Sequence, residues 1–222
     1  QDDEKALFWY KKAAEAGNVV GMIKTGDYLC DNGYAADARR WFEKATEEGD
    51  EELKGWAFYR LGDMYANGLL GAGNISMAVH YYQTASDFGC VQGTLDLANC
   101  YDDGMGVAVD KHRAASYFEQ VAKDGNDEQK GFACLRLGAM YRDGELGEEN
   151  YPRAATYFKK SADLGNESGV FCLAMCHQYG LGVKEDVKYA AQLYARAARA
   201  GIEEAAEALE ELKKEEGGLL KD

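Results

Sequence analysis

The sequence is poor in proline, in long apolar runs and in basic residues. Pro152 is its only proline among 222 residues, so helices can form almost anywhere along the chain. No run approaches the roughly 18 apolar residues of a membrane-spanning helix, and we expect no membrane insertion. Lys and Arg number 25 against 39 Asp and Glu, a net charge of −14. Nucleic-acid binding and attraction to an anionic membrane both need a basic face, so this balance argues against them.

Large aliphatic residues are also scarce. Leu, Ile, Val and Phe make up only 40 of the 222 residues, and such a composition with a high net charge also occurs in disordered chains. The chain contains 33 Ala and 15 Tyr, however. A core in which small residues face large rings can form if their spacing is regular, so the spacing decides between a folded and a disordered chain.

An aromatic block recurs six times with the same internal spacing. It contains an Ala, an aromatic pair three and four residues later, and a Gly eleven positions after the Ala. The copies are Ala6, Trp9-Tyr10, Gly17; Ala38, Trp41-Phe42, Gly49; Ala78, Tyr81-Tyr82, Gly89; Ala114, Tyr117-Phe118, Gly125; Ala154, Tyr157-Phe158, Gly165; and Ala190, Leu193-Tyr194, Gly201. We expect this block to form a helix, here called helix B, which the Gly ends in a left-handed cap.

A second block lies between the aromatic blocks. It reads large-small-x-x-Tyr-x-x-Gly in Leu61-Gly62, Leu97-Ala98, Leu137-Gly138 and, with His177 for Tyr, Leu173-Ala174. Thr25-Gly26 opens a degenerate first copy. A small residue also stands four positions before each large one, and these positions share one face of a helix. We call this helix A, and we expect its small residues to allow close approach by helix B.

The two blocks predict an all-α fold, a right-handed α-solenoid of stacked helix-turn-helix repeats with about twelve helices. Residues 1–17 form a partial first repeat with helix B alone, residues 18–201 form five hairpins, and residues 202–222 form a C-terminal capping helix and tail. The closing glycines Gly49, Gly125 and Gly201 are 76 residues apart, which indicates that hairpins two and three pair as four and five do. Gly217-Gly218 reads as part of a frayed tail.

These motifs resemble the Sel-one-like repeat (SLR) family, which is related to the tetratricopeptide repeats. The run Lys5-Ala6 to Gly17 matches the family pattern almost throughout, and the repeats beginning at Leu97 and Leu173 match most of it. The departures include the short first repeat, His177, Leu193, and Asn74 and Asn150 where Asp is expected.

The resemblance implies a noncatalytic scaffold, used as an adaptor in bacterial host interaction and signalling or in eukaryotic membrane-protein quality control. We therefore expect a protein- or peptide-binding module with no enzymatic activity and no cofactor. The alternative is a structural or regulatory repeat segment of a larger multidomain protein that has no ligand of its own.

Metal and disulfide sites are poorly supported by the spacing. Of the six cysteines only Cys100 and Cys176 share a repeat position, so regular disulfide stapling is disfavoured and a reducing, cytoplasmic location is favoured over export. Cys172 and Cys176 share a helix face with the zinc-binding spacing, but the neighbouring His177 points elsewhere and a fourth ligand is missing. We expect no metal site.

The helix A positions one before, two after and five after the Leu line the concave surface in tetratricopeptide arrays. By analogy, the partner-binding residues expected here are Lys24, Asp27, Arg60, Asp63, Asp96, Asn99, Arg136, Arg142 and Met175. Tyr59 and Met140 are added because an inner surface rich in Arg, Tyr and Met favours a binding module. Arg60, Arg136 and Arg142 form a candidate anchor for a partner carboxylate. The competing interpretation pairs these arginines with Asp63, Asp96 and Asp102. Phe8, Trp9 and Tyr10 of the first helix are a candidate surface for self-association.

Overall fold

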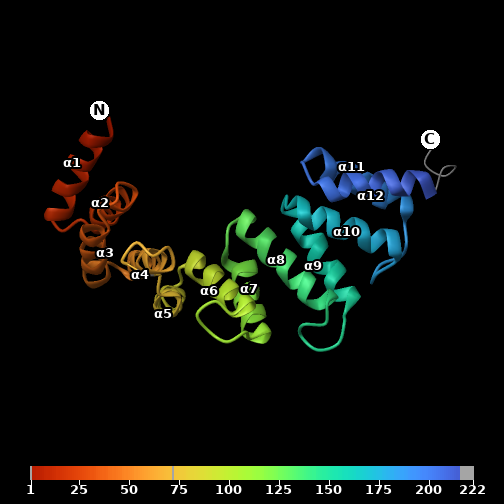
Figure 1. Cartoon of the computed structure of the whole chain (residues 1–222), viewed down its shortest axis with the longest axis horizontal. Coiled ribbons are helices and arrows are strands. Elements are labelled where there is room, and N and C mark those ends of the chain that lie inside the picture. Colours follow the sequence, from red (N-terminus) through yellow and green to blue (C-terminus); the bar gives the residue numbers. More distant parts are fainter. Residues whose placement is uncertain (1, 72, 216–222) are drawn as a thin grey trace. The chain divides into compact units, whose positions relative to one another are not determined.

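The protein is all-α, as the block spacing predicts. The computed structural model describes residues 2–71 and 73–215, and this part of the chain contains twelve α-helices and no strand (Figure 1). In chain order the helices are α1 Asp2–Glu15, α2 Val19–Asp31, α3 Ala35–Glu48, α4 Glu51–Ala66, α5 Ile75–Asp87, α6 Val91–Asp103, α7 Lys111–Asp124, α8 Asp127–Arg142, α9 Tyr151–Asp163, α10 Glu167–Tyr179, α11 Val187–Arg199 and α12 Glu203–Glu215. The expected tail at Gly217-Gly218 lies outside the described residues.

The even-numbered helices are the A helices and the odd-numbered ones the B helices. The chain divides into two compact units, Gln1–Ala114 and Ala115–Asp222. In unit 1 the A helices α2, α4 and α6 contact one another in succession, and in unit 2 α8 contacts α10. Each A helix also packs on B helices next to it in sequence, as α4 does on α3 and α5. The fold of each unit is therefore a stack of helical hairpins, which is the α-solenoid arrangement.

Asn and Asp side chains begin most of the helices. Asn74 and Asn150, which depart from the expected Asp, accept hydrogen bonds from the backbone N–H groups of Met77 and Arg153. Asp186 does the same for Tyr189 in the last hairpin. Asn and Asp are about equally good at this N-cap position, so the two departures preserve the local structure.

In hairpins one, two and four, the second ring of the aromatic pair packs directly on a glycine of helix A. A Cβ added at Gly62 would lie 2.7 Å from the Tyr82 ring, and one added at Gly138 would lie 2.6 Å from the Phe158 ring. Phe158 is 0% exposed and Tyr82 is 5% exposed. The same contact joins Gly26 to Phe42. Ring and backbone thus interlock in hairpins one, two and four, which helps to build a core from few large aliphatic residues.

The prediction that every closing glycine adopts a left-handed cap is wrong at two positions. Gly89 and Gly165 have φ values of +78° and +86°, but Gly49 has φ −73°, and Gly125 is not among the glycines with positive φ. A Cβ on Gly49 would lie 2.9 Å from the Ala45 carbonyl oxygen. Close approach to the Ala45 carbonyl therefore explains the glycine at position 49. After Gly49 and Gly125 the chain turns directly into the longer A helices α4 and α8.

Hairpins two and three interlock through a loop, and hairpins four and five do so in the same way. Gly106, in the turn after α6, lies against the backbone of Ile75 at the start of α5, and Ser76 Oγ donates a hydrogen bond of 3.1 Å to its carbonyl oxygen. Gly182 occupies the same position against Tyr151 at the start of α9. These contacts give the 76-residue periodicity a structural basis.

The seated rings predict that Gly138→Ala destabilises the protein. Alanine is favoured over glycine in a helix by about 1 kcal/mol, but its methyl group would collide with Phe158, and overpacking costs about 1–3 kcal/mol. Gly131→Ala in the same helix is the matched control, because its Cβ would meet no atom closer than 3.2 Å. Urea unfolding followed by circular dichroism should show that Gly138→Ala is less stable than Gly131→Ala. The reverse order would contradict the tight packing of Phe158 on Gly138.

Candidate protein-interaction faces

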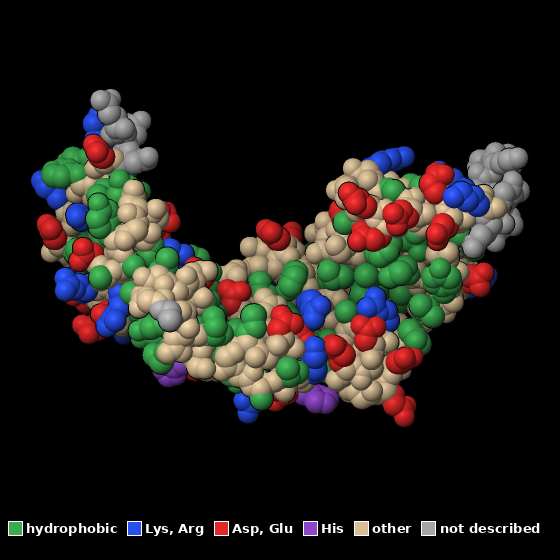
Figure 2. Space-filling view, viewed as in Figure 1, with side chains coloured by type: hydrophobic (Ala, Val, Ile, Leu, Met, Phe, Trp, Pro, Cys, Tyr) green, Lys and Arg blue, Asp and Glu red, His purple; other side chains and the backbone are tan. Residues whose placement is uncertain are grey.

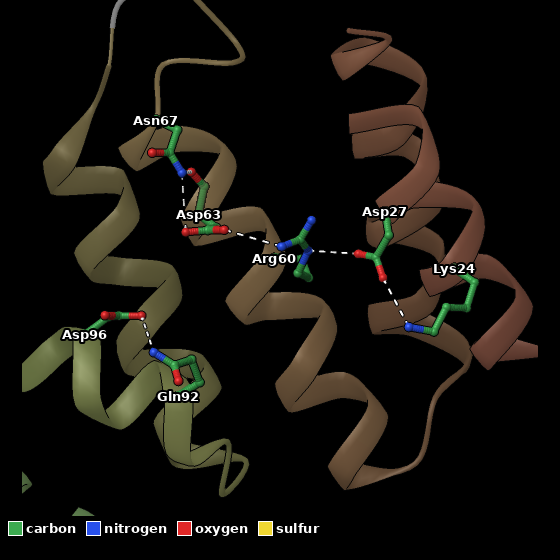
Figure 3. A network of polar contacts seen from close by, with 7 residues as sticks. All are labelled: Lys24, Asp27, Arg60, Asp63, Asn67, Gln92 and Asp96. Carbon is green, nitrogen blue, oxygen red and sulfur yellow. Dashed lines mark hydrogen bonds and ion pairs between the residues drawn. The ribbon is translucent and has the colours of Figure 1, made fainter. Parts of the chain in front are cut away.

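The A helices of unit 1 carry a connected set of charges. We call Lys24, Asp27, Tyr59, Arg60, Asp63, Asp96 and Asn99 the A face of unit 1. Arg60 Nε lies 2.9 Å from Asp27 Oδ1, and Arg60 Nη1 lies 3.4 Å from Asp63 Oδ2 (Figure 3). Lys24 Nζ lies 3.5 Å from Asp27 Oδ2. The network thus joins α2 to α4 through Arg60, and its residues come from the positions that the sequence singled out.

Arg60 is held from several directions. Its side chain is 21% exposed, and its guanidinium lies 5.7 Å from the centroid of the Phe42 ring. The Nε–Asp27 approach is a charge contact without the alignment of a hydrogen bond, whereas Asp63 accepts a hydrogen bond from Nη1. Half-exposed pairs of this kind stabilise by about 0–1 kcal/mol each. Their main effect is to keep Arg60 neutralised by its own chain.

Asp96 lies on the same face and lacks such a cation. Its Oδ2 accepts a hydrogen bond of 3.1 Å from the Gln92 amide, and within the described residues it forms no ion pair. Burial raises the pKa of Asp96 above its ordinary value, the Gln92 hydrogen bond lowers it, and the nearby Asp63 charge raises it further. The A face therefore has three carboxylates, Asp27, Asp63 and Asp96, but two cations, Lys24 and Arg60.

Aromatic rings lie beside these carboxylates. The Tyr59 ring stacks on Tyr82, with centroids 6.0 Å apart, and contacts Trp56 at 5.2 Å. Burial, then the charges of Asp63 and Asp96, raise the pKa of the Tyr59 hydroxyl, so the phenol is neutral at pH 7. Asn99 is half-buried on α6, one turn after Asp96. The face thus combines rings, a neutral amide and excess carboxylate.

Unit 2 has a different A face, defined here by Arg136, Arg142 and Met175. Arg142 forms a two-point pair with Asp143, with Nε–Oδ1 at 2.7 Å and Nη2–Oδ2 at 2.8 Å. This pairing lowers the pKa of Asp143, to which the Arg136 charge also contributes. Met175 is half-buried and packs on the core of unit 2 together with Phe171.

Met140 is not a surface residue, and its inclusion among the partner-binding positions is wrong. Its side chain is 0% exposed. It stands three residues after Leu137, and the residues at the same position in other A helices, Met64, Cys100 and Cys176, are 2–4% exposed. This position faces the hairpin core, so the methionine contributes to packing.

The arginines follow the pairing interpretation more closely than the anchor interpretation. Arg60 pairs with Asp63 as expected and also with Asp27, whereas Arg142 pairs with its neighbour Asp143. Asp102, another expected partner, is 3% exposed and pairs with Lys111 at 2.6 Å instead. Arg60 belongs to unit 1, and Arg136 and Arg142 belong to unit 2. A carboxylate anchor of all three arginines therefore stays a prediction.

The sequence reading missed the partners that complete the network. Asn67 Nδ2 donates a hydrogen bond of 3.4 Å to Asp63 Oδ1, and Gln92 donates one to Asp96 (Figure 3). Both pairs are four residues apart in a helix, a spacing that brings side chains together. That spacing was the available signal.

The cysteines and histidines form no evident reaction centre. All six cysteines are free, and burial raises the pKa of Cys172 and of Cys176 to about 11, so both thiols are protonated at pH 7. The His177 ring meets the Tyr189 ring edge-on at 4.8 Å. Within the described residues no group of three His, Cys, Asp or Glu side chains could hold a metal ion.

The first helix exposes an apolar surface. Phe8, Trp9 and Tyr10 are 52%, 64% and 39% exposed, and hydrophobic side chains are visible over α1 in Figure 2. The corresponding second ring in hairpins one, two and four is at most 5% exposed. Self-association through α1 stays a prediction. None of the helices in the described residues has the length and apolar character needed to cross a membrane.

Because the half-buried Asp96 carboxylate has no ion pair within the described residues, we expect Asp96→Asn to stabilise the protein at pH 7. A raised folded-state pKa means that the ionised form is disfavoured in the fold, so the cost is present above that pKa and disappears as the pH falls to the ordinary value of 3.8. The gain in unfolding free energy should therefore shrink on acidification. Urea titrations between pH 7 and pH 4 measure it. Asp63→Asn, which removes one of the two carboxylates paired with Arg60, is the control and should not stabilise; equal gains from both variants would refute the assignment.

The comparisons with known proteins agree with this architecture. The chain is 27% identical over 225 residues to chitin synthase regulatory factor 3 of Schizosaccharomyces pombe, covering 95% of this chain and 23% of that protein. It is 30% identical over 204 residues to the rat (Rattus norvegicus) DAP3-binding cell death enhancer 1, covering 90% and 36%. It thus spans about a quarter to a third of these relatives.

A solved structure is also similar. The structure of c5321, a protective antigen of uropathogenic Escherichia coli strains with an SLR fold, matches with a TM-score of 0.81 and 29% identity, covering 94% of this chain and 44% of that one. The Sel1 repeat model matches residues 1–18, 21–50, 57–89, 92–126, 131–166 and 172–202. With these six matches over stacked helical hairpins, the chain belongs to the Sel1 repeat family.

Proposed function

We propose that this chain is a noncatalytic adaptor module that binds a segment of a partner protein on the A face of unit 1. Sel1 repeats in general mediate interactions between proteins. Three successive A helices, α2, α4 and α6, contact one another in this unit and present polar and aromatic side chains at positions that the hairpin core leaves open. A partner segment laid across them would touch all three helices.

The excess carboxylate is the observation that carries this proposal. Asp96 is half-buried, has no ion pair within the described residues, and lies near Asp63 and Tyr59. A basic side chain of the partner would supply the missing cation and pack against the neighbouring ring. Arg60 is already neutralised by Asp27 and Asp63. We therefore favour a basic partner segment over an acidic one.

Peptides selected for binding should carry a Lys or Arg that depends on Asp96. Peptide display against the intact chain, followed by calorimetry, should give ligands whose affinity falls roughly tenfold with Asp96→Asn, equivalent to about 1.4 kcal/mol. Asp87→Asn, on the B helix α5, is the matched control and should leave affinity unchanged. Selected peptides without basic residues, or equal losses in both variants, would contradict the proposal.

A second function, that of a structural segment within a longer repeat array, is favoured by the exposed rings of α1. At the other end of the chain, Glu210 and Lys213 of α12 occupy the positions that hold Gly138 and Tyr141 in α8, and they form an ion pair of 2.9 Å. The charged Glu210 and Lys213 side chains do not offer the small residue on which a ring of a following B helix would pack. If display selection gave no ligand and added repeats before α1 raised stability, the structural function would be the better description.

A further inference from the structure

A cleft lies between the B helices α1 and α3 in unit 1, away from the charged network. It has a volume of about 480 Å³, and Leu29 of α2 and Trp41 of α3 are among its lining residues. Lys11 of α1 and Arg40 and Lys44 of α3 also line it. Comparison with the other hairpins shows why the cleft is there.

In other hairpins a tyrosine of helix A covers the first ring of the aromatic pair. Tyr65 stacks on Tyr81 with centroids 5.4 Å apart and planes at 12°. Tyr141 stacks on Tyr157 at 5.6 Å and 8°. In hairpin four, Arg153 Nη1 also donates a hydrogen bond of 3.2 Å to the Tyr141 hydroxyl. The tyrosine thus lies flat on the ring, with its hydroxyl held at the surface.

Hairpin one has lost both parts of this arrangement. Leu29 stands at the tyrosine position, and Asp37 stands at the position of Arg153. A leucine is too short to cover the Trp41 ring. The lysine that accompanies the stack is retained, since Lys44 lies 5.7 Å from the Trp41 centroid as Lys160 lies 5.2 Å from that of Tyr157. The cleft is therefore the place of a missing phenol ring.

The charge beside the missing ring is also reversed. Five residues after the block alanine, the preceding B helix carries Glu43 near the Tyr65–Tyr81 stack and Glu119 near the Tyr141–Tyr157 stack. The same position beside Trp41 is Lys11. Within the described residues Lys11 forms no ion pair, while Arg40 pairs only loosely with Asp37, at 3.5 Å and with its side chain 80% exposed.

Glu15 and Asp37 also line the cleft, so its walls carry both signs. Lys44 pairs with Glu48 at 3.7 Å and Arg40 with Asp37, so Lys11 is the cation of the cleft that forms no ion pair within the described residues. A ligand that enters beside Lys11 meets a cation where the covered sites present a glutamate. Shape therefore selects a planar ring, and this charge selects an acidic group next to it.

We propose that the cleft between α1 and α3 binds a tyrosine side chain of a partner protein, flat on Trp41, with an adjacent carboxylate of the partner near Lys11. This is a second site, separate from the A face of unit 1, and it does not depend on the function proposed for that face. The ligand class is a tyrosine followed by an acidic residue. The ring contact provides apolar and stacking attraction, and Lys11 provides the preference for an acidic neighbour.

N-acetyl-tyrosyl-glutamate is the probe that tests the proposal, with N-acetyl-leucyl-glutamate as its ring-free control. Added to the full chain during nuclear magnetic resonance titration, the tyrosyl probe should shift the indole signal of Trp41 and leave those of Trp9 and Trp56 in place. The leucyl probe should bind at least fivefold more weakly. Equal binding of the two probes, or shifts centred on Trp9, would overturn the proposal.

Two variants separate shape from charge. Leu29→Tyr combined with Asp37→Arg restores the internal tyrosine and should weaken the tyrosyl probe at least tenfold, with circular dichroism confirming the fold. Lys11→Glu, a substitution on the exposed surface, should weaken the acidic probe three- to tenfold and leave neutral N-acetyl-tyrosinamide unchanged. If the folded Leu29→Tyr/Asp37→Arg variant bound the tyrosyl probe as tightly as the natural chain, the ring of the probe would not enter the cleft.

Opening a second cleft gives a reciprocal test. Tyr141→Leu combined with Arg153→Asp removes the same two groups from hairpin four, where Glu119 stands in place of Lys11. The folded variant should gain a site that accepts neutral N-acetyl-tyrosinamide and binds the acidic probe more weakly. Failure of this variant to bind either probe, while the natural cleft also shows no ring preference, would refute the assignment of ligand class.

Discussion

The structure depends on one contact that recurs along the chain, a large ring seated on the backbone of a small residue. Phe42, Tyr82 and Phe158 each lie where a Cβ on the facing glycine would collide. This contact compensates for the shortage of Leu, Ile and Val, since a ring buries much apolar area on a single side chain. In α2, α4 and α8 the ring packs on the one helix face that carries this glycine. The open face is thereby determined.

The surfaces available for recognition follow from this constraint. The helix A positions that face the hairpin core, such as Met140, Met64 and Cys176, are buried and cannot contact a partner. Positions turned away, such as Arg60, Asp63 and Asp96, form the A face of unit 1 and interact across successive helices. The B-helix side is normally closed by the tyrosine that covers the first ring. Where Leu29 replaces that tyrosine, a cleft opens over Trp41. The proposed second site thus lies where the repeat pattern changes.

The repeated elements were predictable from the sequence because they are local and periodic. The ring, the small residue and the capping Asn or Asp recur at fixed spacing, and each repeat confirms the others. Met140 was misassigned because it was chosen for its residue type; it stands one residue after the exposed position that the analogy gives in this helix, Ala139, and one residue changes the direction of a helical side chain by about 100°. The pair between Arg60 and Asp27 depends on how neighbouring hairpins stack, which no single repeat encodes, whereas the Gln92–Asp96 hydrogen bond follows from the spacing within one helix. Gly49 was misread because close packing and a left-handed turn both select glycine.

The most direct test of the account is to map where a selected basic peptide contacts the chain, using amide chemical shifts of the labelled protein. We expect shifts concentrated in α2, α4 and α6, strongest around Tyr59, Asp96 and Asn99, with α5 little changed. Shifts confined to the exposed rings of α1, or spread evenly over the chain, would show that the A face of unit 1 is not the recognition surface.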